Sequence, residues 1–201
     1  MIDWLRLAED LVSSPWLYLI LIAVSLLDSF LPAIPSEPVI ITAGVYAAAG
    51  ETQLLPVVAA TALGAFIGDM VPYGLGRAMA DRVLDHLPPG TRRRKTHDWL
   101  SAEIEARAGY VLITSRFIPV GRYLVTLTAG ITRLAWPTFA TYTAISCSAW
   151  SVYTVLAGYA GGALFRDNTF VGIAVGMGLA VLVSGGVEAG RYLQRRRARA
   201  G

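Results

Sequence analysis

The stretch SRFIPVGRY, Ser115 to Tyr123, places the strongest constraint on what this chain can fold into. It carries Arg116 and Arg122 inside an apolar run from Tyr110 to Gly130, with Pro119 between the two arginines. A charged side chain at the centre of a bilayer costs at least about 2.5–3.5 kcal/mol, and such charges mostly serve function. If this run lies in a membrane, the fold must accommodate two guanidinium groups and a backbone broken by proline.

The composition indicates that the chain is a membrane protein. Of its 201 residues, 55% are hydrophobic and 15% are charged, whereas soluble domains contain about 25% charged residues. Seven basic residues lie between Arg77 and Arg107 and five between Arg191 and Arg199. Basic blocks can bind nucleic acid, but in a chain this apolar they are typical of cytoplasmic segments under the positive-inside rule. We therefore expect one multi-pass domain with cytoplasmic termini and no nucleic-acid partner.

The pattern of apolar blocks predicts an all-α integral membrane protein with about four transmembrane helices, two opposed re-entrant hairpins and an N-terminal amphipathic helix. Proline removes a backbone donor and clashes with the preceding helical turn, so two apolar stretches cannot be continuous helices. Broken backbone at membrane depth must be covered by protein or line a water-filled cavity, and a re-entrant hairpin meets that requirement. The expected hairpin-breaking residues are Pro32, Pro35, Pro38, Pro119 and Gly121.

The expected segments follow one another within a single domain, residues 1–201. The first crossing includes Trp16 to Phe30 and the residues before Pro15. The other segments are an interfacial helix at 1–14, hairpin one at 32–50, a span at 54–76, a cytoplasmic loop at 77–107, hairpin two at 110–131, spans at 135–164 and 170–190, and a basic cytoplasmic tail at 191–201.

A short sequence motif that occurs twice suggests that the two hairpins belong to an internal repeat. The sequence Gly-x-Thr-x-Leu begins at Gly50 and again at Gly130, and each copy is followed by a proline and an apolar span. A hairpin followed by a span, occurring twice in opposite orientation, is the inverted-repeat plan of secondary transporters. Their substrate sites lie near the midplane, where broken helices meet. The repeated motif therefore predicts a transporter.

Five ionisable residues fall in apolar segments and are the candidate site. Arg116 and Arg122 are six residues apart around a proline, and the planar donor fork of arginine suits phosphate. We therefore expect both arginines to bind a substrate phosphate. Glu37, with Asp28 and Asp69, is the candidate for proton coupling or gating, since burial raises the pKa of a carboxyl group and a nearby arginine lowers it. Structural ion pairing is the alternative, and it stays open for Asp28 and Asp69.

Several motifs resemble the DedA family of bacterial inner-membrane proteins, whose domain is shared with eukaryotic SNARE-associated-type lipid scramblases. The resemblance covers about residues 25 to 165. The motifs that carry it are LLDSFLPAIPSE, GDMVPYGLGR from Gly68 to Arg77, SRFIPVGRY with the following Ala129-Gly130, Trp136-Pro137-x-Phe139, Trp150, and Gly158-Tyr159.

The resemblance implies two facing re-entrant hairpins and the movement of an anionic lipid phosphate across the bacterial inner membrane. By position, the acidic residues of the family fall on Asp28 and Glu37, and its arginines on Arg116 and Arg122. The spacing around the first acid is slightly shorter than in some members, which leaves Asp28 the least secure match. We expect undecaprenyl phosphate as the carried lipid, with dependence on proton motive force. A phosphatidylethanolamine-type phospholipid remains an alternative substrate, and a homodimer remains open.

The main alternative from another class is an enzyme, a membrane lipid phosphatase. Such enzymes need a histidine six residues after the arginine of a Ser-Arg motif, and here that position is Arg122. His86 and His97 lie in a polar segment without a third ligand nearby, so we expect no metal site and no cofactor. A proton-coupled small-molecule exporter or membrane-integrity factor is the remaining alternative. A lipid transporter binds a phosphate-bearing lipid, whereas an exporter has no such need.

Overall fold

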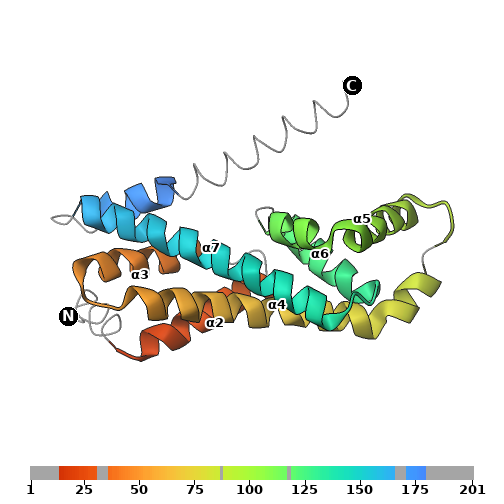
Figure 1. Cartoon of the computed structure of the whole chain (residues 1–201), viewed down its shortest axis with the longest axis horizontal. Coiled ribbons are helices and arrows are strands. Elements are labelled where there is room, and N and C mark those ends of the chain that lie inside the picture. Colours follow the sequence, from red (N-terminus) through yellow and green to blue (C-terminus); the bar gives the residue numbers. More distant parts are fainter. Residues whose placement is uncertain (1–13, 31–35, 87, 117–118, 166–170, 180–201) are drawn as a thin grey trace, which may run out of the picture. The chain divides into compact units, whose positions relative to one another are not determined.

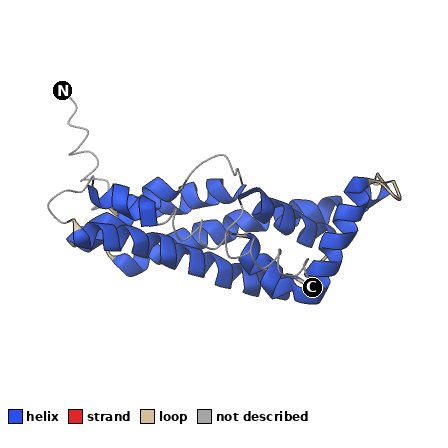
Figure 2. Ribbon diagram, turned by 90° about the horizontal axis from the view of Figure 1, so that it is seen from above, coloured by secondary structure: helices blue, strands red, loops and turns tan. Residues whose placement is uncertain are grey.

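The computed structural model describes residues 14–30, 36–86, 88–116, 119–165 and 171–179, and its secondary structure in these ranges is helical, without strands (Figure 2). A short helical segment covers residues 171–179. The helices that carry labels, in chain order, are α2 (Trp16–Phe30), α3 (Glu37–Ala49), α4 (Leu54–Asp85), α5 (Arg92–Ser115), α6 (Pro119–Ile131) and α7 (Trp136–Leu164) (Figure 1). The expected interfacial helix at 1–14 and the basic tail at 191–201 lie outside the described residues apart from Ser14.

Helix α4 is the element that fits a membrane best. It has 32 residues, which at 1.5 Å per residue gives about 48 Å, more than the hydrocarbon core of about 30 Å. Within the described ranges it is the one helix, over Leu54–Val83, that is long and apolar enough to cross a bilayer by length and composition. The predicted all-α class is confirmed for the described residues, and α4 contains the predicted span at 54–76.

Helices α2 and α3 are too short to cross a bilayer alone. They have 15 and 13 residues, about 22 Å and 20 Å at 1.5 Å per residue. Pro38 is the second residue of α3, where a missing N–H costs no helical hydrogen bond. The helix ends at Gly50, whose φ of 84° is left-handed and favours glycine. Pro32 and Pro35 lie outside the described residues.

Helices α5 and α6 lie side by side as a helical hairpin (Figure 1). Helix α5 begins after Thr91, whose hydroxyl accepts a hydrogen bond from the N–H of Arg94 and so caps the helix. Non-helical torsions at Arg107 kink α5 and separate a polar first part from an apolar second part. Helix α6 begins at Pro119, and Gly121 lies inside its first turn. Helix α5 therefore ends at Ser115, and a separate helix starts at Pro119.

The structure differs from the sequence expectation over residues 77–107. We expected a loop, and instead these residues form the last turns of α4 and most of α5. The charged residues suggested a loop because they lower the mean hydropathy, but charge does not prevent a helix. A turn around Gly90, whose φ is 84°, connects the two helices. Whether the hairpins re-enter a membrane remains a prediction.

The described residues divide into two compact units. The first draws on Met1–Leu21, Ser36–Ala59 and Ser151–Gly201. In it α3 packs closely on α7, because a Cβ on Gly44 would collide with the carbonyl oxygen of Val155, and a Cβ on Gly158 with that of Ile41. The glycines thus let the two backbones approach.

The second unit draws on Ile22–Pro35 and Ala60–Trp150. Here α6 packs on α4 in the same manner, because a Cβ on Gly76 would collide with the carbonyl oxygen of Leu127, and a Cβ on Gly130 with that of Tyr73. A core forms around these helices, in which the rings of Tyr73 and Phe139 stack with centroids 4.1 Å apart. This unit contains both arginines of SRFIPVGRY.

Candidate functional site

Arg116 follows the last residue of α5 and is buried in a polar cage made by other helices. Its Nη1 donates to Oδ2 of Asp69 on α4 at 2.6 Å. Its guanidinium carbon lies 4.9 Å from the centre of a Trp150 ring on α7, within the range of a cation–π contact. The thiol of Cys147 contacts the same Oδ2 of Asp69 at 3.6 Å. Three side chains from α4 and α7 thus fix the position of this guanidinium and its carboxylate partner.

Arg122 lies in the first turn of α6 and is bound to the end of α2. Its Nη2 donates to the main-chain carbonyl of Asp28 at 2.6 Å, and its Nη1 lies 3.4 Å from Oδ2 of the same residue. The carbonyl groups in the last turn of a helix have no partner within the helix, and they carry partial negative charge. Arg122 therefore satisfies both a helix end and a carboxylate.

Both ion pairs are buried, and their four residues lie in apolar segments of the chain. The side chains of Arg116 and Asp69 are 2% and 4% exposed, and those of Arg122 and Asp28 are 8% and 13% exposed. Removing one partner of such a pair leaves an uncompensated charge, which costs about 3–5 kcal/mol. In this structure, each buried arginine therefore needs its carboxylate partner to compensate its charge.

The arginines differ in the donors that they leave available. Among the described residues, Nε and Nη2 of Arg116 have no hydrogen-bond partner, whereas Arg122 leaves only Nε. Nε and Nη2 form one edge of the guanidinium plane, with parallel N–H groups that match two oxygens of a phosphate or carboxylate. Arg116 therefore retains a complete bidentate edge, and Arg122 retains a single donor.

The predicted site residues fall into two groups. The structure brings Asp69 to Arg116 and Asp28 to Arg122 within the second unit. Glu37 is the first residue of α3, is partly exposed, and belongs to the first unit. The roles assigned to these residues in phosphate binding and proton coupling stay predictions.

Sequence reasoning missed a set of contacts that fastens the turn between α6 and α7 to α4. Tyr73 donates its hydroxyl proton to the carbonyl of Leu134 at 2.7 Å, and Arg77 donates to the same carbonyl at 3.3 Å. Arg133, with a positive φ of 55°, binds both carboxylate oxygens of Asp81 at 2.9 Å. The spacing of Tyr73, Arg77 and Asp81 was the available signal, because residues four apart share one face of a helix.

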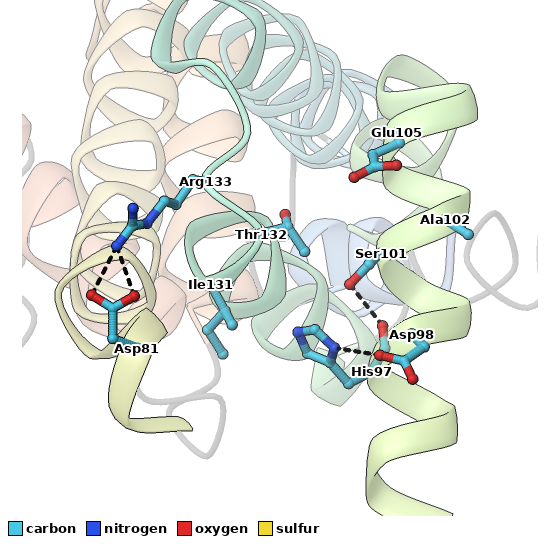
Figure 3. Close-up of a pocket in the computed structure, with 9 residues that line it drawn as sticks. All are labelled: Asp81, His97, Asp98, Ser101, Ala102, Glu105, Ile131, Thr132 and Arg133. Carbon is cyan, nitrogen blue, oxygen red and sulfur yellow. Dashed lines mark hydrogen bonds and ion pairs between the residues drawn. The ribbon is translucent and has the colours of Figure 1, made fainter. Parts of the chain in front are cut away.

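A polar cavity of about 480 Å³ lies beside this turn (Figure 3). It is lined by α5 residues from His97 to Glu105, by residues 131–133, and by Asp81. The hydroxyl of Ser101 donates to the main-chain carbonyl of His97, and the ring nitrogen Nδ1 of His97 lies 3.3 Å from Asp98. No three histidine, cysteine or acidic side chains within the described ranges are placed to hold a metal ion.

Comparison with known proteins gives a consistent family. The model of the VTT domain matches residues 34–160. The chain is 28% identical to Protein DedA of Escherichia coli K12 over 185 residues, which cover 88% of this chain and 84% of that protein. It is 25% identical to undecaprenyl phosphate transporter A of Staphylococcus aureus, over 66% of this chain and 68% of that protein. No solved structure matches.

One relative has an enzyme-like name, and the residues of this chain bear on it. The chain is 28% identical to an alkaline phosphatase-like protein of Lactococcus lactis, over 67% of this chain and 66% of that protein. In this chain, Arg122 stands where a membrane lipid phosphatase needs its histidine, and it is tied to Asp28. Other relatives in the family are named as transporters, among them the undecaprenyl phosphate transporter A of Staphylococcus aureus and that of Bacillus subtilis. The chain is a membrane protein that belongs to the VTT domain family, the family of the DedA proteins.

Proposed function

We propose that this protein moves an anionic lipid phosphate across the bacterial inner membrane and that Arg116 is the principal phosphate ligand. The observation that carries the proposal is the buried, fixed guanidinium of Arg116, whose Nε and Nη2 have no partner among the described residues. A phosphate monoester has at least two oxygens for that edge, and its lipid tail can stay in the bilayer. The site then needs only a groove.

Arg122 has a different role in this proposal. It holds the start of α6 against the end of α2 through the carbonyl and carboxylate of Asp28. Its remaining donor, Nε, adds one hydrogen bond to the same phosphate. The sequence-based expectation gave both arginines the same role in binding phosphate. We now propose different roles, because only Arg116 offers the bidentate edge.

Undecaprenyl phosphate is the lipid that we propose. A relative that is 25% identical is named an undecaprenyl phosphate transporter, and a polyprenyl monophosphate presents more phosphate oxygens to an arginine edge than a phosphodiester does. Transport is proposed to depend on proton motive force, with Glu37, Asp28 and Asp69 as candidate proton sites. A proton on Asp69 would weaken its hold on Nη1 of Arg116 and so link protonation to phosphate binding.

The test is transport of undecaprenyl phosphate by the full chain in liposomes, compared among Arg-to-Lys variants. Arg116→Lys keeps the charge but loses the donor fork, so we expect transport to fall at least about tenfold. Arg122→Lys loses the bond to the Asp28 carbonyl and is expected to fall less. Arg133→Lys, at an exposed arginine paired with Asp81, is the matched control. Transport by Arg116→Lys at the wild-type rate would refute the proposal.

Two further measurements separate the alternatives. If phosphatidylethanolamine crosses as fast as undecaprenyl phosphate, the protein is a phospholipid scramblase or flippase instead. If neither lipid is moved and neither co-purifies with the protein, the exporter alternative gains support.

In the same liposomes, Glu37→Gln should abolish any dependence on a pH gradient; a dependence that persists would rule out Glu37 as the proton site.

A further inference from the structure

The first turns of α5 carry a charge pattern that a helix alone does not favour. Arg92, Arg93, Arg94 and Lys95 open the helix, while its first turn holds no acidic residue. The start of a helix carries partial positive charge, so cations there are unfavourable unless an anion is close. Arg94 is paired with Asp98, but no ion pair involves Arg92 or Lys95 among the described residues. This segment is therefore complementary to an anionic partner.

A groove of about 530 Å³ lies between this part of α5 and the second arm of the hairpin, α6. Its size falls within the usual range of small-molecule sites, about 300–1,000 Å³. It is lined on α5 by Arg92, Thr96, His97 and Leu100, and on α6 by Leu124 and Thr128. The positions of Arg92, Thr96 and Leu100 differ by four, so they share one face of the helix. The groove thus has a basic end at Arg92 and an apolar stretch at Leu100 and Leu124.

His97 adds a polar atom to this groove. Its ring turns away from α5 toward the turn at residues 131–132 (Figure 3). Its side chain is 14% exposed, and its Nε2 is buried without a hydrogen-bond partner among the described residues. A buried polar nitrogen is normally paired, so Nε2 is left with an unmet hydrogen bond among the described residues. Trp99 on the same part of α5 is 63% exposed, as expected of a side chain at a membrane–water interface.

We propose that this groove is a second lipid site, which binds an anionic phospholipid from the surrounding bilayer. The phosphodiester lies at Arg92 with His97 beside it, and the first methylene groups of one acyl chain cover Leu100 and Leu124. Charge complementarity selects an anionic over a zwitterionic headgroup, and the apolar lining selects a lipid over a free phosphate ion. The bound lipid joins the polar part of α5 to α6, the helix that carries Arg122.

This site is distinct from the arginine site of the proposed transport function, so the two can be tested apart. The full chain is purified in a non-ionic detergent, and native mass spectrometry measures retention of phosphatidylglycerol and of phosphatidylcholine with the same acyl chains. The wild type should retain phosphatidylglycerol preferentially. Arg92→Ala should lower that retention about fivefold, as one cation near an anionic surface is worth about 1 kcal/mol. Leu124→Gln should lower the retention of phosphatidylglycerol about threefold, because it offers less apolar surface to the acyl chain of the lipid.

The matched control is Lys95→Ala, which removes an exposed cation from the same turns of α5 but outside the groove. It should change retention less than twofold. Equal losses in Lys95→Ala and Arg92→Ala would show diffuse attraction to basic residues and overturn the site. Competition by millimolar inorganic phosphate, or equal retention of phosphatidylcholine, would overturn it as well. Leu124 is half exposed, so its variant keeps the test valid if Arg92→Ala fails to fold.

Discussion

At the scale of single residues, the cation of Arg116 depends on partners that are far away in the sequence. Asp69 lies 47 positions before it and supplies the counter-charge at 2.6 Å. Trp150 covers the guanidinium, and Cys147 contacts the carboxylate. A buried charge loses most of its hydration, so these contacts replace water. The same contacts hold the guanidinium plane, which keeps its Nε–Nη2 edge in a fixed direction.

Replacing Asp69 by Asn should destabilise the protein by about 3–5 kcal/mol, because the charge of Arg116 is then uncompensated. The double variant Asp69→Asn/Arg116→Gln should recover much of this loss, since neither charge remains. Thermal unfolding of the purified protein in detergent measures both effects. If Asp69→Asn unfolds at the wild-type temperature, the pair does not carry the stability assigned to it.

At the scale of elements, glycines set how closely the helices pack. Gly76 faces the backbone of α6, whereas Gly74, two residues earlier on α4, is exposed and has no atom within 4 Å of an added Cβ. This neighbour provides a matched control for the close approach of α4 and α6.

Gly76→Ala should lower stability by about 1–3 kcal/mol, because the added methyl group forces the two backbones apart. Gly74→Ala should be neutral or stabilising by up to about 1 kcal/mol, as alanine favours helix. Unfolding temperatures of the two variants decide the matter. Equal effects would mean that helix propensity, and not packing, governs both positions.

The fastening of the α6–α7 turn to α4 is a second property of the elements. Tyr73→Phe keeps the ring stacked on Phe139 but removes the hydrogen bond to the carbonyl of Leu134. We expect a loss of about 1 kcal/mol, the usual net value of one such bond. Because Arg77 also donates to that carbonyl, the double variant Tyr73→Phe/Arg77→Ala should lose clearly more. If neither variant lowers the free energy of unfolding, these hydrogen bonds do not fasten the turn to α4.

At the scale of the whole molecule, the two halves of the chain repeat an order of elements. A 13-residue helix precedes a long helix in each half, α3 before the 32 residues of α4 and α6 before the 29 residues of α7. Gly76 lies 22 residues after the first residue of α4, and Gly158 lies 22 residues after the first residue of α7. In each compact unit, this glycine meets the short helix of the other half.

The repeat and the length of α4 predict the sidedness of the loops. Cysteines introduced at Glu51 and Pro89, both exposed and placed before and after α4, should react with a membrane-impermeant thiol reagent from opposite sides. Labelling of intact cells and of inverted vesicles measures this. The native Cys147 is 1% exposed and should remain unlabelled. Reaction of both positions from one side would rule out a crossing by α4.

The sequence by itself determined the class of the protein and which residues are unusual. The apolar blocks predicted helices in a membrane, since hydropathy alone drives that choice. The prolines predicted helix boundaries, and Pro38 and Pro119 indeed lie in the first turns of α3 and α6. Two arginines in an apolar run identified the candidate site, because charge there is expensive whatever the fold.

Only the tertiary structure decided how those charges are paired. The sequence left the partners of Asp28 and Asp69 open, since the carboxylates lie 94 and 47 positions from the arginines that they contact. Such pairing depends on helices that approach through Gly64, Gly68 and Gly76. The structure also distinguished the two arginines. Which donors of each guanidinium stay unpaired depends on three-dimensional packing, and the sequence motif does not contain that information.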